Sequence, residues 1–82
     1  MKKIRFYPNV REEVRAIEQN TAMNILAAIH RYAATGAGRV KPLGGEFAGL
    51  LRLRVGNHRV FFEETEDTIT IHRVRDRREA YR

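Results

Sequence analysis

Eighty-two residues, 43% of them hydrophobic, suit one domain spanning residues 1–82 with a modest core. The chain lacks any cysteine, a secretory signal and an apolar run of the roughly 20 residues that cross a bilayer, so we expect a cytoplasmic protein with no membrane partner. The net charge of +6, mostly from arginine, favours polyanionic partners, nucleic acid before an acidic protein, although a merely solvated basic surface has the same composition.

The N-terminal segment predicts a strand followed by a short helix. Residues 2–7 alternate apolar and polar side chains, as a short strand does, and Pro8 ends them. Asn9 and Glu12 have the spacing of a capping box. The apolar stripe of this first helix consists of Val10, Val14 and Ile17.

A longer amphipathic helix follows, capped by Asn20 or Thr21 and ended by Gly36. Its apolar positions recur at intervals of three and four residues: Ala22, Ile25, Leu26, Ile29, Tyr32 and Ala33. The glycine-rich residues 36–45 match neither GxGxxG nor a Walker motif, so they predict a loop that crosses to a sheet.

The C-terminal half predicts a three-stranded meander, LLRLRV, HRVFFE and TITIHRV. Gly56-Asn57 is a two-residue hairpin signal, and it sets Arg54 opposite Arg59. A four-residue loop over 64–67 sets Arg59 opposite His72 in turn. One face is then apolar and covered by the helices: Leu51, Leu53, Val55, Val60, Phe62, Ile69 and Ile71. The open face carries Arg52, Arg54, Arg59, Phe61, Thr68, Thr70 and His72.

The opposed Arg54 and Arg59 are a like-charge pair, which costs stability unless an anion lies between them. We interpret the pair as an anion site, because few acids share its face. In the alternative interpretation Glu63 or Glu46 supplies an internal counter-ion.

The C-terminal stretch HRVRDRREAYR adds arginines beside Tyr81, an aromatic residue that can stack on a base, and this combination suits single-stranded RNA. Alternatively, Asp76 and Glu79 pair with those arginines while Tyr81 packs down. The three histidines, His30, His58 and His72, lack zinc spacing, so no metal site is expected. Of the three, only His72 is an acid-base candidate.

Two segments, KPLGGEFAGLLRLRVGNHRVFFEE and ITIHRVRDRREAY, resemble the RelE/ParE toxin-antitoxin superfamily. The pieces LxG, RxRVGxxR and RREAY lie at the separations of that family, and the likeness covers nearly the whole chain. It implies an α+β fold in the order β-α-α-β-β-β, with a small, mainly antiparallel sheet and two N-terminal helices packed on one face. It also implies a short C-terminal turn or helix and an active site on the open face of the sheet.

By this resemblance the chain is similar to RelE-like toxins of type II toxin-antitoxin systems, which cut messenger RNA on the ribosome without a metal or cofactor. A ribose 2′-hydroxyl attacks the adjacent phosphate and leaves a 2′,3′-cyclic phosphate, while arginines stabilise the charge that accumulates on the phosphorane. The resemblance implies catalytic roles for Arg52, Arg59, Arg75, Arg77 and Tyr81. The expected RNA-binding residues are Lys41, Arg54, His72, Arg73 and Arg78.

The general base is the point at which this chain departs from the family. Arg52 and Arg54 stand where RelE-like sequences carry basic residues that include a lysine proposed as the base. A guanidinium with a pKa above about 12 holds its proton too tightly for that role. The base is then Lys41, His72, Tyr81 or a group of the ribosome.

Two other activities stay open. ParE-like members of the superfamily inhibit DNA gyrase by binding it, and Tyr81 with its preceding arginines argues against that branch. A catalytically silent RNA-binding domain is the other alternative, because the lysines are missing. The resemblance implies a cognate antitoxin, with the ribosome and mRNA as partners of the RelE-like branch. DNA would be contacted only indirectly, through an antitoxin complex.

Overall fold

The structure, a computed structural model, describes residues 1–81 as five strands and two α-helices. The elements are β1 (Lys3–Phe6), α1 (Pro8–Arg15), α2 (Gln19–Thr35), β2 (Arg39–Pro42), a short 3-10 helix (Gly45–Phe47), β3 (Leu51–Val55), β4 (His58–Glu64) and β5 (Thr68–Asp76). The sheet order is β1-β5-β4-β3-β2, antiparallel except where β1 pairs with β5. The expected α+β fold is confirmed, and β2 is an additional strand.

Strand β2 lies in the segment predicted as a loop, so that prediction is wrong for residues 39–42. Val40 pairs with Leu53 of β3 on the helix side of the sheet, whereas Arg39 and Lys41 lie on the open side. The strand is at the edge, where Pro42 does not cost a ladder hydrogen bond.

Both predicted helix N-caps are wrong. Helix α1 begins at Pro8, whose fixed φ suits the first helical position, and no side chain caps it. Helix α2 begins after Glu18, whose carboxylate accepts hydrogen bonds from the backbone N–H groups of Asn20 and Thr21, both at 2.9 Å. These bonds lower the pKa of Glu18 below its usual value. The predicted end of α2 is confirmed, because Gly36 adopts a left-handed φ of 76°.

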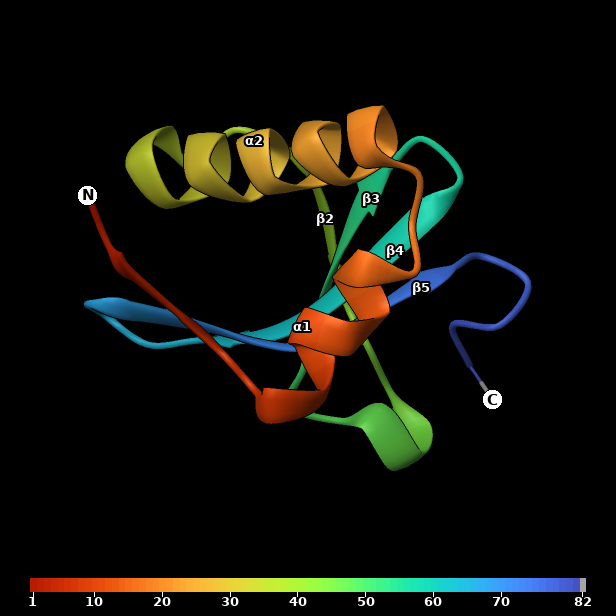
Figure 1. Cartoon of the computed structure of the whole chain (residues 1–82). Coiled ribbons are helices and arrows are strands. Elements are labelled where there is room, and N and C mark those ends of the chain that lie inside the picture. The colour runs from red at the N-terminus through yellow and green to blue at the C-terminus, as the bar shows by residue number, and fades with distance from the viewer. Residues whose placement is uncertain (82) are drawn as a thin grey trace.

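The core lies between the sheet and the two helices. Val10 of α1 and Ile25 and Ile29 of α2 are buried against an apolar sheet face formed by Leu53, Val60, Phe62, Ile69, Ile71 and Val74. In Figure 1, α1 lies beside β5 and α2 passes over β3. Neither helix of residues 1–81 has the length and apolar character needed to cross a membrane.

The β3–β4 register is confirmed, with Arg54 opposite Arg59 and a positive φ of 56° at Gly56 of the turn. The predicted β4–β5 register is wrong. The hairpin is shifted so that Phe62 faces Ile71, and a bulge between Phe61 and Phe62 then sets Arg59 opposite Arg75 instead of His72.

Helix α1 completes the edge of β5 where β1 has ended. The side chain of Asn9 donates to the backbone oxygen of His72 at 3.0 Å, and Glu13 accepts from the backbone N–H of Val74 at 2.8 Å. These bonds satisfy backbone groups that an uncovered edge would leave unpaired. They flank the irregular part of β5, and the bulge reverses which side chains of that strand reach the open face.

Candidate functional site

The open face of the sheet carries two rows of cross-strand neighbours. Residues that face each other on adjacent strands project from the same side of a sheet. The first row is Arg39, Arg54, Arg59 and Arg75, and the second is Lys41, Arg52, Phe61 and Arg73. Seven of the eight positions are cationic. The predicted site residues on β3, β4 and β5 are therefore brought together, apart from His72.

Arg59 is at the centre of the first row and is only 7% exposed. Its Nη1 donates to the backbone oxygens of Gly56 at 3.2 Å and His58 at 3.0 Å. Burial, followed by the charges of Arg54 and Arg52, lowers the pKa of Arg59. Within residues 1–81 neither Glu63 nor Glu46 forms an ion pair with Arg54 or Arg59, so these two facing charges lack a carboxylate partner.

A hollow of about 300 Å³ opens beside Arg54 at the β2–β3 end of the face. It is lined by Gly38, Arg39, Val40, Lys41, Arg52 and Arg54. Four of these six residues are cationic and none is acidic. Guanidinium groups converge on this hollow in the way that suits the oxygens of a phosphate.

Tyr81 lies on the open face and adjoins the arginines. Its hydroxyl accepts a hydrogen bond from Arg52 Nη1 at 3.0 Å. Its ring lies against Phe61, with the ring centroids 5.3 Å apart, and against Phe47 at 6.0 Å. Ala80 is fully buried beside it, and Tyr81 as a residue is 46% exposed. The C-terminal segment is thereby docked, and Tyr81 stays partly exposed on the open face.

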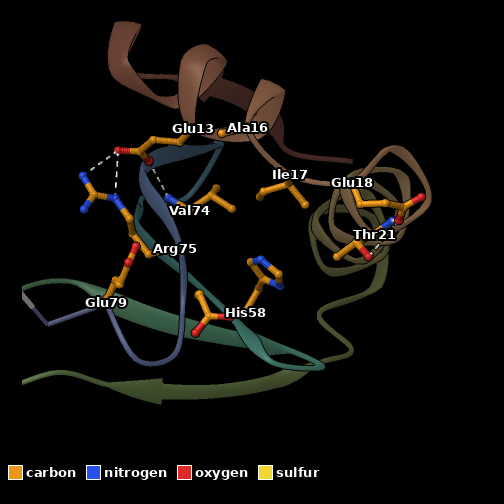
Figure 2. A pocket seen from close by; sticks show the side chains of 10 residues that line it. Glu13, Ala16, Ile17, Glu18, Thr21, His58, Val74, Arg75 and Glu79 are labelled. Atoms are coloured by element: carbon orange, nitrogen blue, oxygen red, sulfur yellow. Dashed lines mark hydrogen bonds and ion pairs between the residues drawn. The ribbon is translucent and has the colours of Figure 1, made fainter.

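Arg75 belongs to the arginine row, but its charge is compensated from α1. Its Nε and Nη2 lie 3.3 Å and 3.1 Å from Glu13 Oε2. Figure 2 shows Glu13 reaching both Arg75 and the backbone of Val74. The pocket in that view, about 470 Å³ in volume, has an acidic rim formed by Glu13, Glu18, Asp76 and Glu79. Within the first row, Arg75 is therefore the member whose charge a carboxylate compensates.

Three other predicted site residues lie outside the arginine rows. His72 packs against Tyr7, with ring centroids 3.9 Å apart, and its Nε2 is 3.4 Å from Glu63. Its predicted place beside Arg59 is wrong, because Arg75 faces Arg59. Arg77 and Arg78 are exposed in the turn after β5. Arg77 also lowers the pKa of Arg59, whereas Arg78 pairs with Asp76 at 3.4 Å. Among residues 1–81, no three His, Asp or Glu side chains are grouped to hold a metal ion.

The sequence reasoning missed Arg39, Phe47 and the counter-ion Glu13. Arg39 was detectable, because Arg39, Val40 and Lys41 alternate in the period of a strand and put both cations on one face. Glu13 was not detectable, since its contact with Arg75 joins residues 62 positions apart.

Comparisons with known proteins agree with this architecture. The chain is similar in fold to RelE in the RelE–RelB complex from Pyrococcus horikoshii OT3, with a TM-score of 0.77, 18% identity, and 96% of this chain and 98% of that chain covered. It is also similar to the RelB–RelE complex from Methanococcus jannaschii, with a TM-score of 0.75, 22% identity and 94% of each chain covered. For RelBE2 from Mycobacterium tuberculosis the TM-score is 0.67, the identity 25% and the coverage 92% and 96%.

At the level of sequence, no curated protein matches the chain. The family described as the ParE toxin of the type II toxin-antitoxin system parDE has a family model that matches residues 4–81. That match spans nearly all of the strands and helices described above. The chain therefore belongs to the ParE toxin family, within the RelE/ParE superfamily of type II toxin-antitoxin toxins.

Proposed function

We propose that this toxin is a ribosome-dependent, metal-independent endoribonuclease that inhibits translation by cutting messenger RNA. The observation that carries the proposal is the row of Arg39, Arg54 and Arg59, which has no carboxylate partner among residues 1–81. Like charges on facing strands destabilise a sheet, and a bound phosphodiester relieves that cost. A phosphodiester also matches the cationic hollow beside the row.

The proposed reaction is a transesterification. The ribose 2′-oxygen attacks phosphorus and loses its proton to a base, the bond from phosphorus to the 5′-oxygen breaks, and that oxygen takes up a proton. Arg59 and Arg54 stabilise the charge on the phosphoryl oxygens, with Arg77 adding to the field. Arg75, which is already paired with Glu13, lies at the edge of the site.

Lys41 and Tyr81 are the proton-transfer candidates that the geometry favours. Lys41 faces Arg52 across β2 and β3, and the Tyr81 hydroxyl bonds to the same Arg52. His72 is farther away, in the bulge against Tyr7. We assign the base and the acid of the reaction to Lys41 and Tyr81, within reach of a phosphate held by Arg52.

A cognate antitoxin is the proposed protein partner. The solved relatives from Pyrococcus horikoshii and Methanococcus jannaschii are complexes of RelE with RelB. An acidic or amphipathic segment of such a partner would cover the arginine rows and exclude RNA. Because it binds only the folded toxin, it would also raise the apparent stability of this small domain.

Mapping message ends in a translating extract tests the proposal. Wild type should give ribosome-positioned cuts with 5′-hydroxyl ends. If the reaction needs no metal, the cuts should persist when a chelator that leaves the ribosomes intact is added. Arg59→Ala should lower cleavage by about 100- to 1000-fold, the usual cost of losing one transition-state donor. Arg31→Ala, which removes an exposed arginine from α2, is the matched control and should cut normally.

The name of the matching family supports a second candidate, inhibition of DNA gyrase. Intact messages together with arrested gyrase would select that activity and overturn the ribonuclease. Strongly salt-dependent RNA binding without cleavage would instead select a silent RNA-binding domain.

A further inference from the structure

A second hollow, of about 280 Å³, lies on the open face at the end opposite the cationic hollow. Its lining comes from α1, the segment before β3, β4 and β5, and consists of Tyr7, Asn9, Glu13, Phe47, Leu50, Phe61, His72, Arg73 and Arg75. Four of these nine side chains are aromatic rings if His72 is included. Phe61, Arg73 and Arg75 belong to the two rows described above, and the other six lining residues lie outside them.

The aromatic rings that line the hollow form two pairs. Tyr7, which is 42% exposed, packs against His72 with the ring centroids 3.9 Å apart and the ring planes tilted by 34°. Phe47 packs edge-on against Phe61 at 5.3 Å, and the Arg73 guanidinium lies 5.5 Å from the centre of the Phe47 ring. Planar rings and guanidinium groups are the surfaces on which unpaired bases stack.

The charge of the open face changes along the first row. Arg39, Arg54 and Arg59 have no carboxylate partner within residues 1–81, whereas Arg75 is paired with Glu13. The end formed by β2, β3 and β4 therefore attracts a phosphate more strongly. The end formed by β5 and α1 is better suited to an uncharged ring. Neighbouring strands are about 4.8 Å apart, so the aromatic hollow begins close to a phosphate held at Arg59.

Asn9 supplies a polar group at the rim of this hollow. Its amide nitrogen donates to Glu13 at 3.0 Å and to the His72 backbone oxygen at 3.0 Å. The two bonds fix the orientation of the carboxamide and leave its oxygen without a hydrogen bond to residues 1–81. A fixed amide oxygen accepts hydrogen bonds from the exocyclic amino group of a base.

We propose that this hollow is a base-binding subsite that takes the base of a nucleotide whose phosphate lies against Arg59 and Arg54. The inference rests on the proposed ribonuclease function and extends it, because it gives the RNA a direction across the sheet. Tyr7 provides the stacking surface and Asn9 the hydrogen-bond acceptor, which favours bases with an amino group.

Mononucleotide binding to the purified toxin tests the subsite without requiring cleavage. Adenosine 5′-monophosphate should bind about tenfold more tightly than ribose 5-phosphate in calorimetric titrations at low salt, because only the former has a base to stack. Tyr7→Ala should remove most of this difference, and Tyr7→Phe should retain it. Uridine 5′-monophosphate, which lacks an amino group, should bind more weakly than the adenosine nucleotide.

Thermal unfolding checks that Tyr7→Ala remains folded, as expected from the exposure of the Tyr7 ring. Equal binding of the two phosphates by wild type would overturn the proposal, and an antitoxin side chain would then be the occupant to test. A preference that survives Tyr7→Ala but disappears in Tyr81→Ala would also overturn it, since the base would then stack on Tyr81.

The outcomes separate this inference from the proposed function. Cleavage of messages without a preference for the adenosine nucleotide would overturn the subsite and keep the ribonuclease. A clear preference that depends on Tyr7, in a toxin that cuts no message, would overturn the ribonuclease and keep a nucleotide-binding hollow.

Discussion

The two sides of the sheet differ in whether their charged side chains are paired with an opposite charge. On the helix side, Glu64 accepts hydrogen bonds from Lys2 and Tyr32, both at 2.6 Å, and at the β5 edge Glu13 compensates Arg75. On the open side, Arg54 and Arg59 face each other with no carboxylate between them among residues 1–81. The fold thus pairs charges where it must be stable and leaves them unpaired where we propose that a partner binds.

The largest expected change in unfolding free energy comes from a substitution in the apolar core on the helix side of the sheet. Phe62 is 1% exposed, lies against Tyr32 and belongs to the apolar core. Phe62→Ala should lower the free energy of unfolding by about 3–5 kcal/mol, through lost burial and the cavity left behind. Urea unfolding followed by circular dichroism measures the change. A midpoint equal to that of wild type would contradict the assignment of the core.

The next largest effect concerns the ion pair between Glu13 and Arg75 at the edge of β5. Glu13→Gln keeps an oxygen for the Val74 N–H group but removes the charge that compensates Arg75. We expect a loss of about 1 kcal/mol in unfolding free energy. The freed guanidinium should also strengthen RNA binding and steepen its salt dependence by about one phosphate contact.

Unfolding and fluorescence anisotropy with a single-stranded RNA measure these two results for Glu13→Gln. Glu12→Gln is the matched control, because Glu12 is exposed on the same helix. An RNA affinity that changes equally in both variants would show that only net charge matters, and not the pairing of Arg75.

The sequence predicted the β3–β4 hairpin well because one local signal decided it. Gly56-Asn57 specifies a two-residue turn, and the turn fixes which residues face each other. The acidic segment before β5 has no such preference. Thr65 and Thr68 continue the hairpin instead, with the Thr65 N–H donating to the Thr68 oxygen at 2.8 Å, and this shifts the register.

The candidate site was predictable only in part for the same reason. Residues on the locally specified hairpin, Arg52, Arg54 and Arg59, lie where the alternation put them. His72 does not, because it lies in the irregular part of β5 that contacts α1 through Asn9. Contacts between distant segments have no signature in a single sequence, so neither the bulge nor the place of Arg73 in the second row was accessible from patterns.

A third prediction uses pH to test the compensated group on the helix side. Burial alone would raise the pKa of Glu64, but the hydrogen bonds from Lys2 and Tyr32 outweigh it and lower the pKa. Burial and the bond to Glu64 also raise the pKa of Tyr32 to about 12. The folded state therefore binds fewer protons at Glu64 than the unfolded chain does.

It follows that the stability from Glu64 is fully present above its unfolded pKa and is lost as the pH falls through the lower, folded value. Glu64→Gln should reduce the unfolding free energy by about 1 kcal/mol at pH 7, and the two curves should converge in acid. Urea unfolding between pH 2 and pH 7 measures this. Glu66→Gln, at an exposed turn position, should follow wild type throughout.

The smallest expected change in stability comes from removing one charge of the arginine row on the open side. Arg54 is exposed and faces Arg39 on one neighbouring strand and Arg59 on the other. Arg54→Gln relieves both like-charge contacts, so the toxin should gain a few tenths of a kcal/mol in unfolding free energy. RNA binding should weaken, and its salt dependence should fall by about one phosphate contact.

Arg31→Gln removes the same charge from an exposed helix position and should leave both quantities nearly unchanged. If Arg54→Gln alone raises the unfolding free energy and weakens RNA binding, the arginine row lowers the stability of the fold and strengthens the binding of its ligand. Destabilisation by Arg54→Gln would mean that the row is already neutralised within the folded toxin, and the phosphate site would have to lie elsewhere.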